Sequence, residues 1–306
     1  MTFIDILSKQ RINSVGRIGR PHSDATKALY VKRLERFNPT EYKNNEELLG
    51  KIQELFPNRN TQLGYFSAIL AYYEGIHQKE NIQFWETKRK QINQEYMKEK
   101  EEGILPSGQK ENLVKKSLIQ KLIKKTKDDI KLKPDRQLHQ ILLFLLNYTT
   151  YPFRNELATI KKGLLLDFNE NPENYKEGNW LMVSPKPFSI KYVFNEYKTA
   201  GSYQQRIIDI MDKTVRNNYR MFLQTYPMEY GEAVFIQKGG NSMNNHNLTQ
   251  VLQKYTEKTI GKKISTTLLR KIYYSSKYDK VDIKELKEDA RVAGHSVNTA
   301  QNIYIV

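Results

Sequence analysis

The spacing of apolar residues constrains the fold of this chain more than any other feature of its sequence. Through most of the chain, apolar side chains recur every three or four positions, as in the segment SDATKALYVKRLERF that starts at Ser23. This period places them on one face of a helix. Only NWLMVSP, FSIKYVFNEYKT and SYQQRIIDI, all in the second half, are typical of strands. The sequence therefore predicts a mainly α (α+β) protein with a small antiparallel β-sheet.

Glycine, proline and polar clusters divide the chain into four parts. Residues 1–22 are basic and contain Gly16, Gly19 and Pro21, so we expect an irregular N-terminal arm. Residues 23–102 contain four helical patterns and form a first, helical domain. Residues 103–112 have the composition of a linker. Residues 113–306 form a second domain, which begins with a helix that carries eight lysines, LVKKSLIQKLIKKTKDDIKLK.

Length and composition exclude several classes of protein. A chain of 306 residues accommodates two domains. Its longest purely apolar run, from Ile141 to Leu146, is far shorter than the ~20 residues that span a membrane. The first twenty residues lack the apolar stretch of a secretory signal. With no cysteine, the chain has neither disulfides nor thiolate metal sites. We therefore expect an intracellular protein without a membrane segment.

The net charge is the first indication of a partner. Fifty Lys and Arg against 34 Asp and Glu give +16, and aromatic residues make up 11% of the chain. A positive field of this size attracts polyanions, and neutralisation of phosphates supplies most sequence-independent affinity for nucleic acid. A lysine-rich solvated surface, reflecting an AT-rich genome, explains the same composition. Charge alone leaves both interpretations open.

Common cofactor and metal motifs are absent from the sequence. It has no glycine-rich phosphate loop, no HExxH and no GxSxG. The histidines show no metal-ligand spacing; they are His22, His77, His139, His246 and His295. We therefore expect no cofactor, no metal and no use of ATP.

Four segments, in a fixed order, carry a resemblance to a known family. The last is AGHSVNTAQNIYIV, in which Tyr304 follows His295 by nine residues. About 25 residues before His295 lies TTLLRKIYYSS, with Arg270. Further upstream, TTYPFRNELATI contains Arg154, and NEYKTAGSYQQRIIDI, in the predicted hairpin, contains Lys198. The set resembles the catalytic boxes of tyrosine recombinases, the family of lambda-integrase-like phage integrases.

The resemblance implies a role for each of these residues. Tyr304 is the expected nucleophile, and attack on a phosphodiester leaves the DNA on a 3′-phosphotyrosyl link that needs neither ATP nor metal. Arg154, expected on a helix, and Arg270 clamp the non-bridging oxygens, where negative charge develops. Lys198 is the expected general acid for the departing 5′-oxygen. His295 donates a hydrogen bond to the phosphate.

Three positions depart from the pattern of that family. Thr267 stands where the family has the histidine of its H-x-L-R box, and a threonine can still donate one hydrogen bond. Glu156 follows the first arginine by two residues, whereas the commonest bacterial form has its acid after three. The segment around Lys198 lacks the frequent Gly-Lys-Gly pattern, so Lys191 and Lys186 remain candidates for the general acid.

The resemblance also implies an assembly. Residues 23–102 are similar to a core-binding domain that, with the catalytic domain, forms a C-shaped clamp around double-stranded DNA, and the lysine-rich helix follows phosphates across it. We expect a homotetramer on two DNA sites and a monomer or dimer without DNA. Only two residues follow Tyr304, so any exchange of segments between protomers would use another segment or a very short tail.

Two other functions remain open at this point. A type IB topoisomerase uses the same phosphotyrosine chemistry to relax supercoils, although the helical N-terminal domain favours a recombinase. A recombinase-derived DNA-binding protein with weakened catalysis is compatible with Thr267. The composition suits a virus or mobile element, so we expect the protein in the cytoplasm or nucleus of a host cell, or packaged in a virion.

Overall fold

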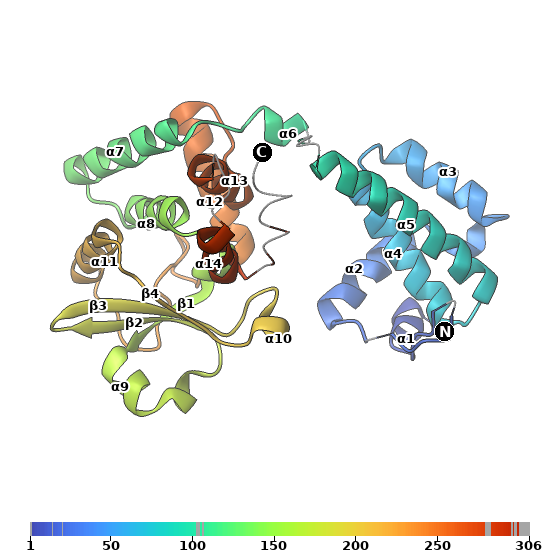
Figure 1. Cartoon of the computed structure of the whole chain (residues 1–306), viewed down its shortest axis with the longest axis horizontal. Helices are drawn as coiled ribbons and strands as arrows, with labels where there is room; N and C mark the ends of the chain where they lie inside the picture. The colour runs from blue at the N-terminus through green and yellow to red at the C-terminus, as the bar shows by residue number, and fades with distance from the viewer. Residues whose placement is uncertain are drawn as a thin grey trace. The chain divides into compact units, whose positions relative to one another are not determined.

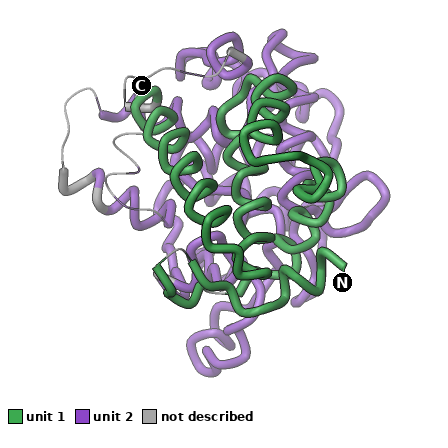
Figure 2. The backbone as a smooth tube through the Cα atoms, turned by 90° about the vertical axis from the view of Figure 1, so that its right-hand side faces the viewer, with its two compact units in different colours: residues 1–104 green, residues 105–306 purple. Residues whose placement is uncertain are grey.

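The fold is that of a computed structural model, which describes residues 2–13, 15–19, 21–101, 105, 107–278, 283–294, 296 and 299. The chain divides into two compact units, residues 1–104 and 105–306 (Figure 2). The division lies at the start of the segment whose composition is that of a linker. Helices dominate both units, and one small sheet lies in the second, so the predicted mainly α class is confirmed.

Unit 1 is built around one buried helix. Its elements are α1 (Phe3–Leu7), α2 (Asp24–Arg36), η1 (Pro39–Glu41), α3 (Asn45–Leu55), α4 (Arg59–Gly75) and α5 (Lys79–Glu101). The α4 helix contacts each of the four α-helices around it. Side chains of Ser23, Asn44 and Asn58 accept backbone N–H groups and so cap the starts of α2, α3 and α4. The four helices expected from the sequence are confirmed.

The prediction of an irregular arm is wrong for Phe3–Leu7, which forms α1. Thr2 and Asp5 form a capping box at its start, and Ile6 and Leu7 are buried against α2 and α4. At Gly75 a Cβ atom would lie 2.5 Å from the Ile6 carbonyl oxygen, so the close approach of α1 requires glycine. Five residues are too few to reveal a helical period in the sequence.

The α8 helix of unit 2 is buried along most of its length. The larger helices are α7 (Lys116–Leu132), α8 (Arg136–Thr150), α11 (Lys213–Thr225), α12 (Asn245–Ile260), α13 (Thr266–Lys277) and α14 (Ile283–Ala293). The short ones are α6 (Ser107–Lys110), η2 (Asn155–Thr159), α9 (Leu165–Glu170), η3 (Pro172–Tyr175) and α10 (Ala200–Tyr203). The α8 helix packs against α7, α11 and α13 (Figure 1).

The sheet of unit 2 is mixed, not antiparallel as predicted. Its order is β1 (Ile160–Leu164), β2 (Asn179–Pro185), β3 (Phe188–Phe194) and β4 (Arg206–Asp209). The β2–β3 and β3–β4 pairs are antiparallel, but β1 runs parallel to β2. A parallel pair needs a crossover connection, and α9 with η3 provides it. The sequence IKKGL of β1 has too few apolar residues to indicate a strand.

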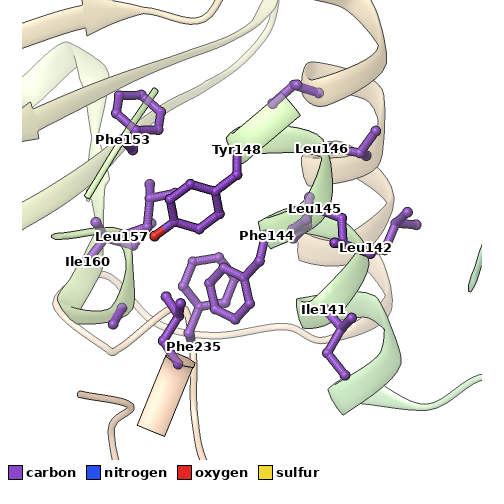
Figure 3. Close-up of a cluster of buried hydrophobic side chains, with 14 of the residues drawn as sticks. Ile141, Leu142, Phe144, Leu145, Leu146, Tyr148, Phe153, Leu157, Ile160 and Phe235 are labelled. Atoms are coloured by element: carbon purple, nitrogen blue, oxygen red, sulfur yellow. The ribbon is translucent and has the colours of Figure 1, made fainter. Parts of the chain in front are cut away.

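Both faces of the sheet are covered, and the larger core lies on the α8 side. Alternate residues of β3, such as Tyr192, face that core, while Val193 faces a smaller cluster under α9 on the opposite side (Figure 1). Figure 3 shows Tyr148, at the end of α8, beside Phe153 and Leu157. The segment that carries Arg154 therefore rests directly on the core.

Candidate active site

A pocket of about 300 Å³ in unit 2 collects residues from four separate segments of the chain. Four of the six predicted site residues line it: Arg154, Lys198, Thr267 and Arg270. The other two predicted residues, His295 and Tyr304, lie outside the described residues. The remaining lining residues are Asn155, Glu156, Glu196, Tyr197, Asn245 and Thr266.

The position of Arg154 is set by contacts of its backbone. Arg154 is the N-cap residue of η2, so the helix expected at this position is a short 3-10 helix that begins at the next residue. Its carbonyl oxygen accepts a hydrogen bond of 2.6 Å from the hydroxyl of Tyr148. Burial raises the pKa of Tyr148 well above its ordinary value, so this hydroxyl remains a donor. Phe153, just before Arg154, is fully buried (Figure 3).

The guanidinium group of Arg154 has unused donors. Its Nε and Nη1 atoms are buried, and no atom of the described residues accepts a hydrogen bond from them. A buried cationic donor without an acceptor is costly, so an anion that accepts from these two atoms would be favoured in the pocket. Arg154 is therefore suited to hold an anion in the pocket.

Arg270 reaches the same pocket from the first turns of α13. Only 7% of it is exposed. Its Nη1 atom donates to the carbonyl oxygen of Phe153 and its Nη2 atom to the hydroxyl of Thr267, each over 3.4 Å. Arg270 is thereby tied to the segment that carries Arg154. Thr267 contacts this arginine from the preceding turn of α13.

The structure separates the three lysines that the sequence left as candidates. Lys198 lies in the connection between β3 and β4, where it lines the pocket and is exposed. Lys191, on β3, pairs with Asp209 of β4 over 3.2 Å. Lys186 lies in the turn between β2 and β3. Of the three, Lys198 alone lines the pocket.

Sequence reasoning missed a buried ion pair at the pocket wall. The Nη2 atom of Arg206 lies 2.5 Å from Oε1 of Glu156, and the exposed fractions of the two residues are 3% and 4%. The guanidinium also lies 3.9 Å from the ring centroid of Tyr197 and donates to the carbonyl oxygen of Val292. Nothing in the strand-like segment SYQQRIIDI indicates a special role for its arginine.

Gly294, the residue before His295, is packed against the connection that carries Lys198. Its φ of +66° lies in the left-handed region, which favours glycine. Its carbonyl oxygen accepts a hydrogen bond of 2.5 Å from Thr199, and an added Cβ would lie 3.0 Å from the same hydroxyl oxygen. The described part of the C-terminal segment therefore reaches the β3–β4 connection directly beside Lys198.

A second cluster holds α14 against α13. The Oδ2 atom of Asp289 accepts hydrogen bonds from the hydroxyl of Tyr273 (2.6 Å), from Nζ of Lys277 (2.9 Å) and from the hydroxyl of Tyr278. Burial, followed by this hydrogen bond, raises the pKa of Tyr278 far above its ordinary value. The start of the segment that leads to His295 is thus anchored to the helix that carries Arg270.

The electrostatics of the pocket favour an anion. Three cationic residues line it against two carboxylates, and one of these, Glu156, is paired with Arg206. The other, Glu196, accepts a hydrogen bond of 3.1 Å from the backbone of Gly178. The N-termini of α12 and α13 also lie at the pocket, and helix N-termini carry partial positive charge.

Two further observations concern cofactors and membranes. Within the described ranges, no three His, Cys, Asp or Glu side chains are grouped so that they could hold a metal ion. In the same part of the chain, no helix combines the length and the apolar character needed to cross a bilayer.

Comparison with known proteins gives a remote likeness to solved structures. No protein-family model matches the chain, and no curated protein matches its sequence. Among solved structures, the chain is similar to one described as the crystal structure of XerA recombinase, with 14% identity and a TM-score of 0.43. The likeness covers 93% of this chain and 88% of that chain. A likeness of this size is too remote to indicate function, which has to be inferred from the pocket and the sequence motifs.

Proposed function

We propose that this protein is a site-specific DNA recombinase or integrase of the tyrosine recombinase type. The observation that carries this proposal is the common pocket of Arg154, Lys198 and Arg270. The order of the sequence motifs groups the same three residues. Gly294, packed beside the pocket-lining connection, supports His295 as a further member of the site.

The proposed reaction is a transesterification. The hydroxyl of Tyr304 gives its proton to solvent water and attacks the phosphorus, the bond from phosphorus to the 5′-oxygen breaks, and a 3′-phosphotyrosyl link forms. Lys198 gives a proton to the departing 5′-oxygen. The reverse attack by a 5′-hydroxyl joins the strands and releases the tyrosine. Each step exchanges one phosphate ester bond for another, so their number is unchanged.

The two arginines have distinct positions in this reaction. The unused Nε and Nη1 donors of Arg154 suit the non-bridging phosphate oxygens, where charge builds up in the transition state. Arg270 contributes a second guanidinium, which Thr267 contacts through its hydroxyl. We assign Thr267 the role of aligning Arg270, in place of the proton management that a histidine would perform. His295 donates a hydrogen bond to the same phosphate.

Both units are proposed to contact duplex DNA. The α7 helix presents lysines such as Lys121 and Lys124 to solvent, and phosphate contacts of this kind fix a protein on the duplex without reading its sequence. Unit 1 is proposed as the core-binding domain. The active assembly is proposed to be a homotetramer on two DNA sites, which forms from monomers or dimers.

The test is covalent capture of DNA. The full chain is incubated with a library of duplexes that have a randomised centre and a nick beside it. Because of the nick, cleavage releases a short fragment that diffuses away, so the strands cannot be rejoined. We expect a protein–DNA adduct that survives denaturation and is absent in Tyr304→Phe. Duplex binding without an adduct on any member of the library would contradict the proposal and favour a DNA-binding protein derived from a recombinase.

A second assay separates the proposal from a topoisomerase. A recombinase is expected to select a small set of sequences from the adduct library. Relaxation of supercoiled plasmids without site preference, together with adducts spread over the whole library, would instead identify a type IB topoisomerase.

A further inference from the structure

The buried Arg206 lies behind the pocket wall and contacts two of its lining residues, Glu156 and Tyr197, although no motif assigns it a role. Its guanidinium contacts the carboxylate of Glu156, the ring of Tyr197 and the carbonyl oxygen of Val292. These three partners precede or follow the proposed site residues by one to three positions. Glu156 is two residues after Arg154, Tyr197 is next to Lys198, and Val292 is three residues before His295.

We propose that Arg206 is a positioning residue for the phosphate site, which it serves by cancelling the charge of Glu156 and by joining the three segments that carry Arg154, Lys198 and His295. The inference rests on the proposed function, because it takes the ligand of this pocket to be a phosphodiester. Arg206 itself does not line the pocket, so it acts through its neighbours.

The need for charge cancellation follows from the position of Glu156. This residue lines the pocket, and its side chain is only 2% exposed, so water screens it little. An unpaired carboxylate at this place would repel a phosphate and oppose the cations Arg154 and Arg270. The ion pair with Arg206, at 2.5 Å, removes that repulsion. Glutamate is thereby tolerated in the wall of an anion site.

The joining role follows from the geometry of the guanidinium. A planar guanidinium can donate in several directions in its plane while its face stacks on an aromatic ring, and the ammonium group of a lysine has no such face. Here one side donates to Glu156 and another to Val292, while the face stacks on Tyr197. An added Cβ at Gly294 would lie 3.2 Å from Nη1, which shows how closely the C-terminal segment approaches.

The experiment measures the affinity of the full chain for inorganic phosphate by titration calorimetry. The variants are Arg206→Met, Glu156→Gln and the double variant with both changes. Arg206→Met leaves the carboxylate unpaired, so we expect phosphate to bind on the order of tenfold more weakly. The double variant removes both charges, so its affinity should return to within about threefold of the original, and any deficit that remains is the contribution of the lost joining contacts. Glu156→Gln alone should bind phosphate at least as tightly as the original chain.

Two controls locate the effect. Arg154→Ala should abolish the measured binding, which identifies the pocket as its site. Arg291→Met removes a positive charge from an exposed pair with Glu288 on α14 and should leave the affinity unchanged. Circular dichroism establishes that each variant is folded, and Glu156→Gln still tests the inference if Arg206→Met does not fold.

The inference is overturned if the folded double variant binds as weakly as Arg206→Met, if Glu156→Gln weakens binding, or if the original chain binds no phosphate in this pocket. A purely structural role of Arg206 predicts the first of these results. Adduct formation by Tyr304 is measured separately. A chain that forms no adduct can still show the phosphate affinities expected for Arg206, and a chain that forms the adduct can lack them, so the two failures are distinguishable.

Discussion

Arg154 and Arg270 line one pocket but differ in how much of the fold depends on them. Arg270 is buried and donates to the backbone of Phe153, whereas Arg154 has two buried donors that no described residue accepts. The first arrangement contributes to stability, and the second leaves donors that a ligand can use. The two arginines should therefore respond differently to substitution.

Arg154→Ala is expected to slow adduct formation on the order of a hundredfold, the usual effect of losing one donor to a developing charge. Its melting temperature should change little. Arg270→Ala should slow the reaction and also lower the free energy of unfolding by about 1–3 kcal/mol, because buried partners lose their donor. Arg220→Ala, on the exposed side of α11, is the control. A rate within twofold of the original for Arg154→Ala would contradict this assignment.

His22 gives unit 1 a predictable response to pH. Burial, followed by the charges of Arg11 and Lys27, lowers the pKa of His22 to about 4. In the unfolded chain it is about 6.5. The unfolded state therefore binds the proton first, and the stability of unit 1 should fall as the pH drops from about 6.5 to about 4.

The measurement uses the fluorescence of Trp85, which is fully buried in unit 1, with Trp180 of unit 2 replaced by phenylalanine. Denaturant unfolding is followed between pH about 7 and about 4.5. In this background His22→Gln should remove most of the pH dependence in that window. An unchanged slope would show that His22 does not control the acid response.

At the scale of elements, the attachment of α14 decides whether the C-terminal segment is held near the pocket. The contacts of its described residues include a small buried cluster formed by Tyr273, Tyr274, Tyr278, Leu286 and Ala290, the three hydrogen bonds to Asp289, and Val292, which belongs to the main core. Because one carboxylate accepts all three hydrogen bonds, local opening of α14 should become less costly when Asp289 is replaced. The segment leading to His295 should therefore depend strongly on Asp289.

Asp289→Ala is expected to destabilise the attachment of α14 by about 2 kcal/mol, since three donors lose a charged acceptor. Amide hydrogen exchange in α14 should accelerate on the order of thirtyfold, while exchange in α8 stays unchanged. Glu288→Ala is the matched control. Glu288 precedes Asp289 in the sequence, and its carboxylate pairs with Arg291 at the exposed surface of α14. Equal exchange rates in the two variants would contradict the role given to Asp289.

The elements of this fold differ in how visible they are in the sequence. The α2, α8 and α13 helices were predictable because each has a capping side chain and a long apolar period. The β1 strand was not predictable. It is an edge strand with the sequence IKKGL, and its strand conformation depends on pairing with β2. Local pattern does not report pairing between distant segments.

The same limit applies to the candidate site. Arg154, Lys198 and Arg270 were found because a family pattern fixes their order, not because their surroundings differ from those of other basic residues. Arg206 has no such pattern. Its importance arises from contacts with Glu156 and Val292, which lie 50 and 86 residues away in the sequence. Only the folded chain brings them together.

At the scale of the whole molecule, the charge of +16 should make affinity for duplex DNA fall steeply with salt. Each phosphate contact contributes about −0.9 to the slope of log affinity against log salt concentration. We expect Lys121→Ala with Lys124→Ala, on the exposed side of α7, to make that slope shallower by about 2.

The control for this prediction is Lys176→Ala, whose ammonium group pairs with Glu173 in η3, in the crossover on the α9 side of the sheet. Fluorescence anisotropy with a labelled duplex of arbitrary sequence is sufficient, because phosphate contacts do not depend on sequence. If the α7 variant and the control have the same slope, α7 does not contact DNA.

The central claim is that Tyr304 is the nucleophile of a DNA strand transfer. The most direct measurement is mass spectrometry of the peptide linked to DNA after adducts are trapped on the nicked library and digested with trypsin and nuclease. Cleavage after Arg291 releases a peptide that begins at Val292 and contains Tyr304 as its only tyrosine. We predict a 3′-linked nucleotide on that peptide and none in Tyr304→Phe. A nucleotide on any other peptide, or a 5′ linkage, would contradict the claim.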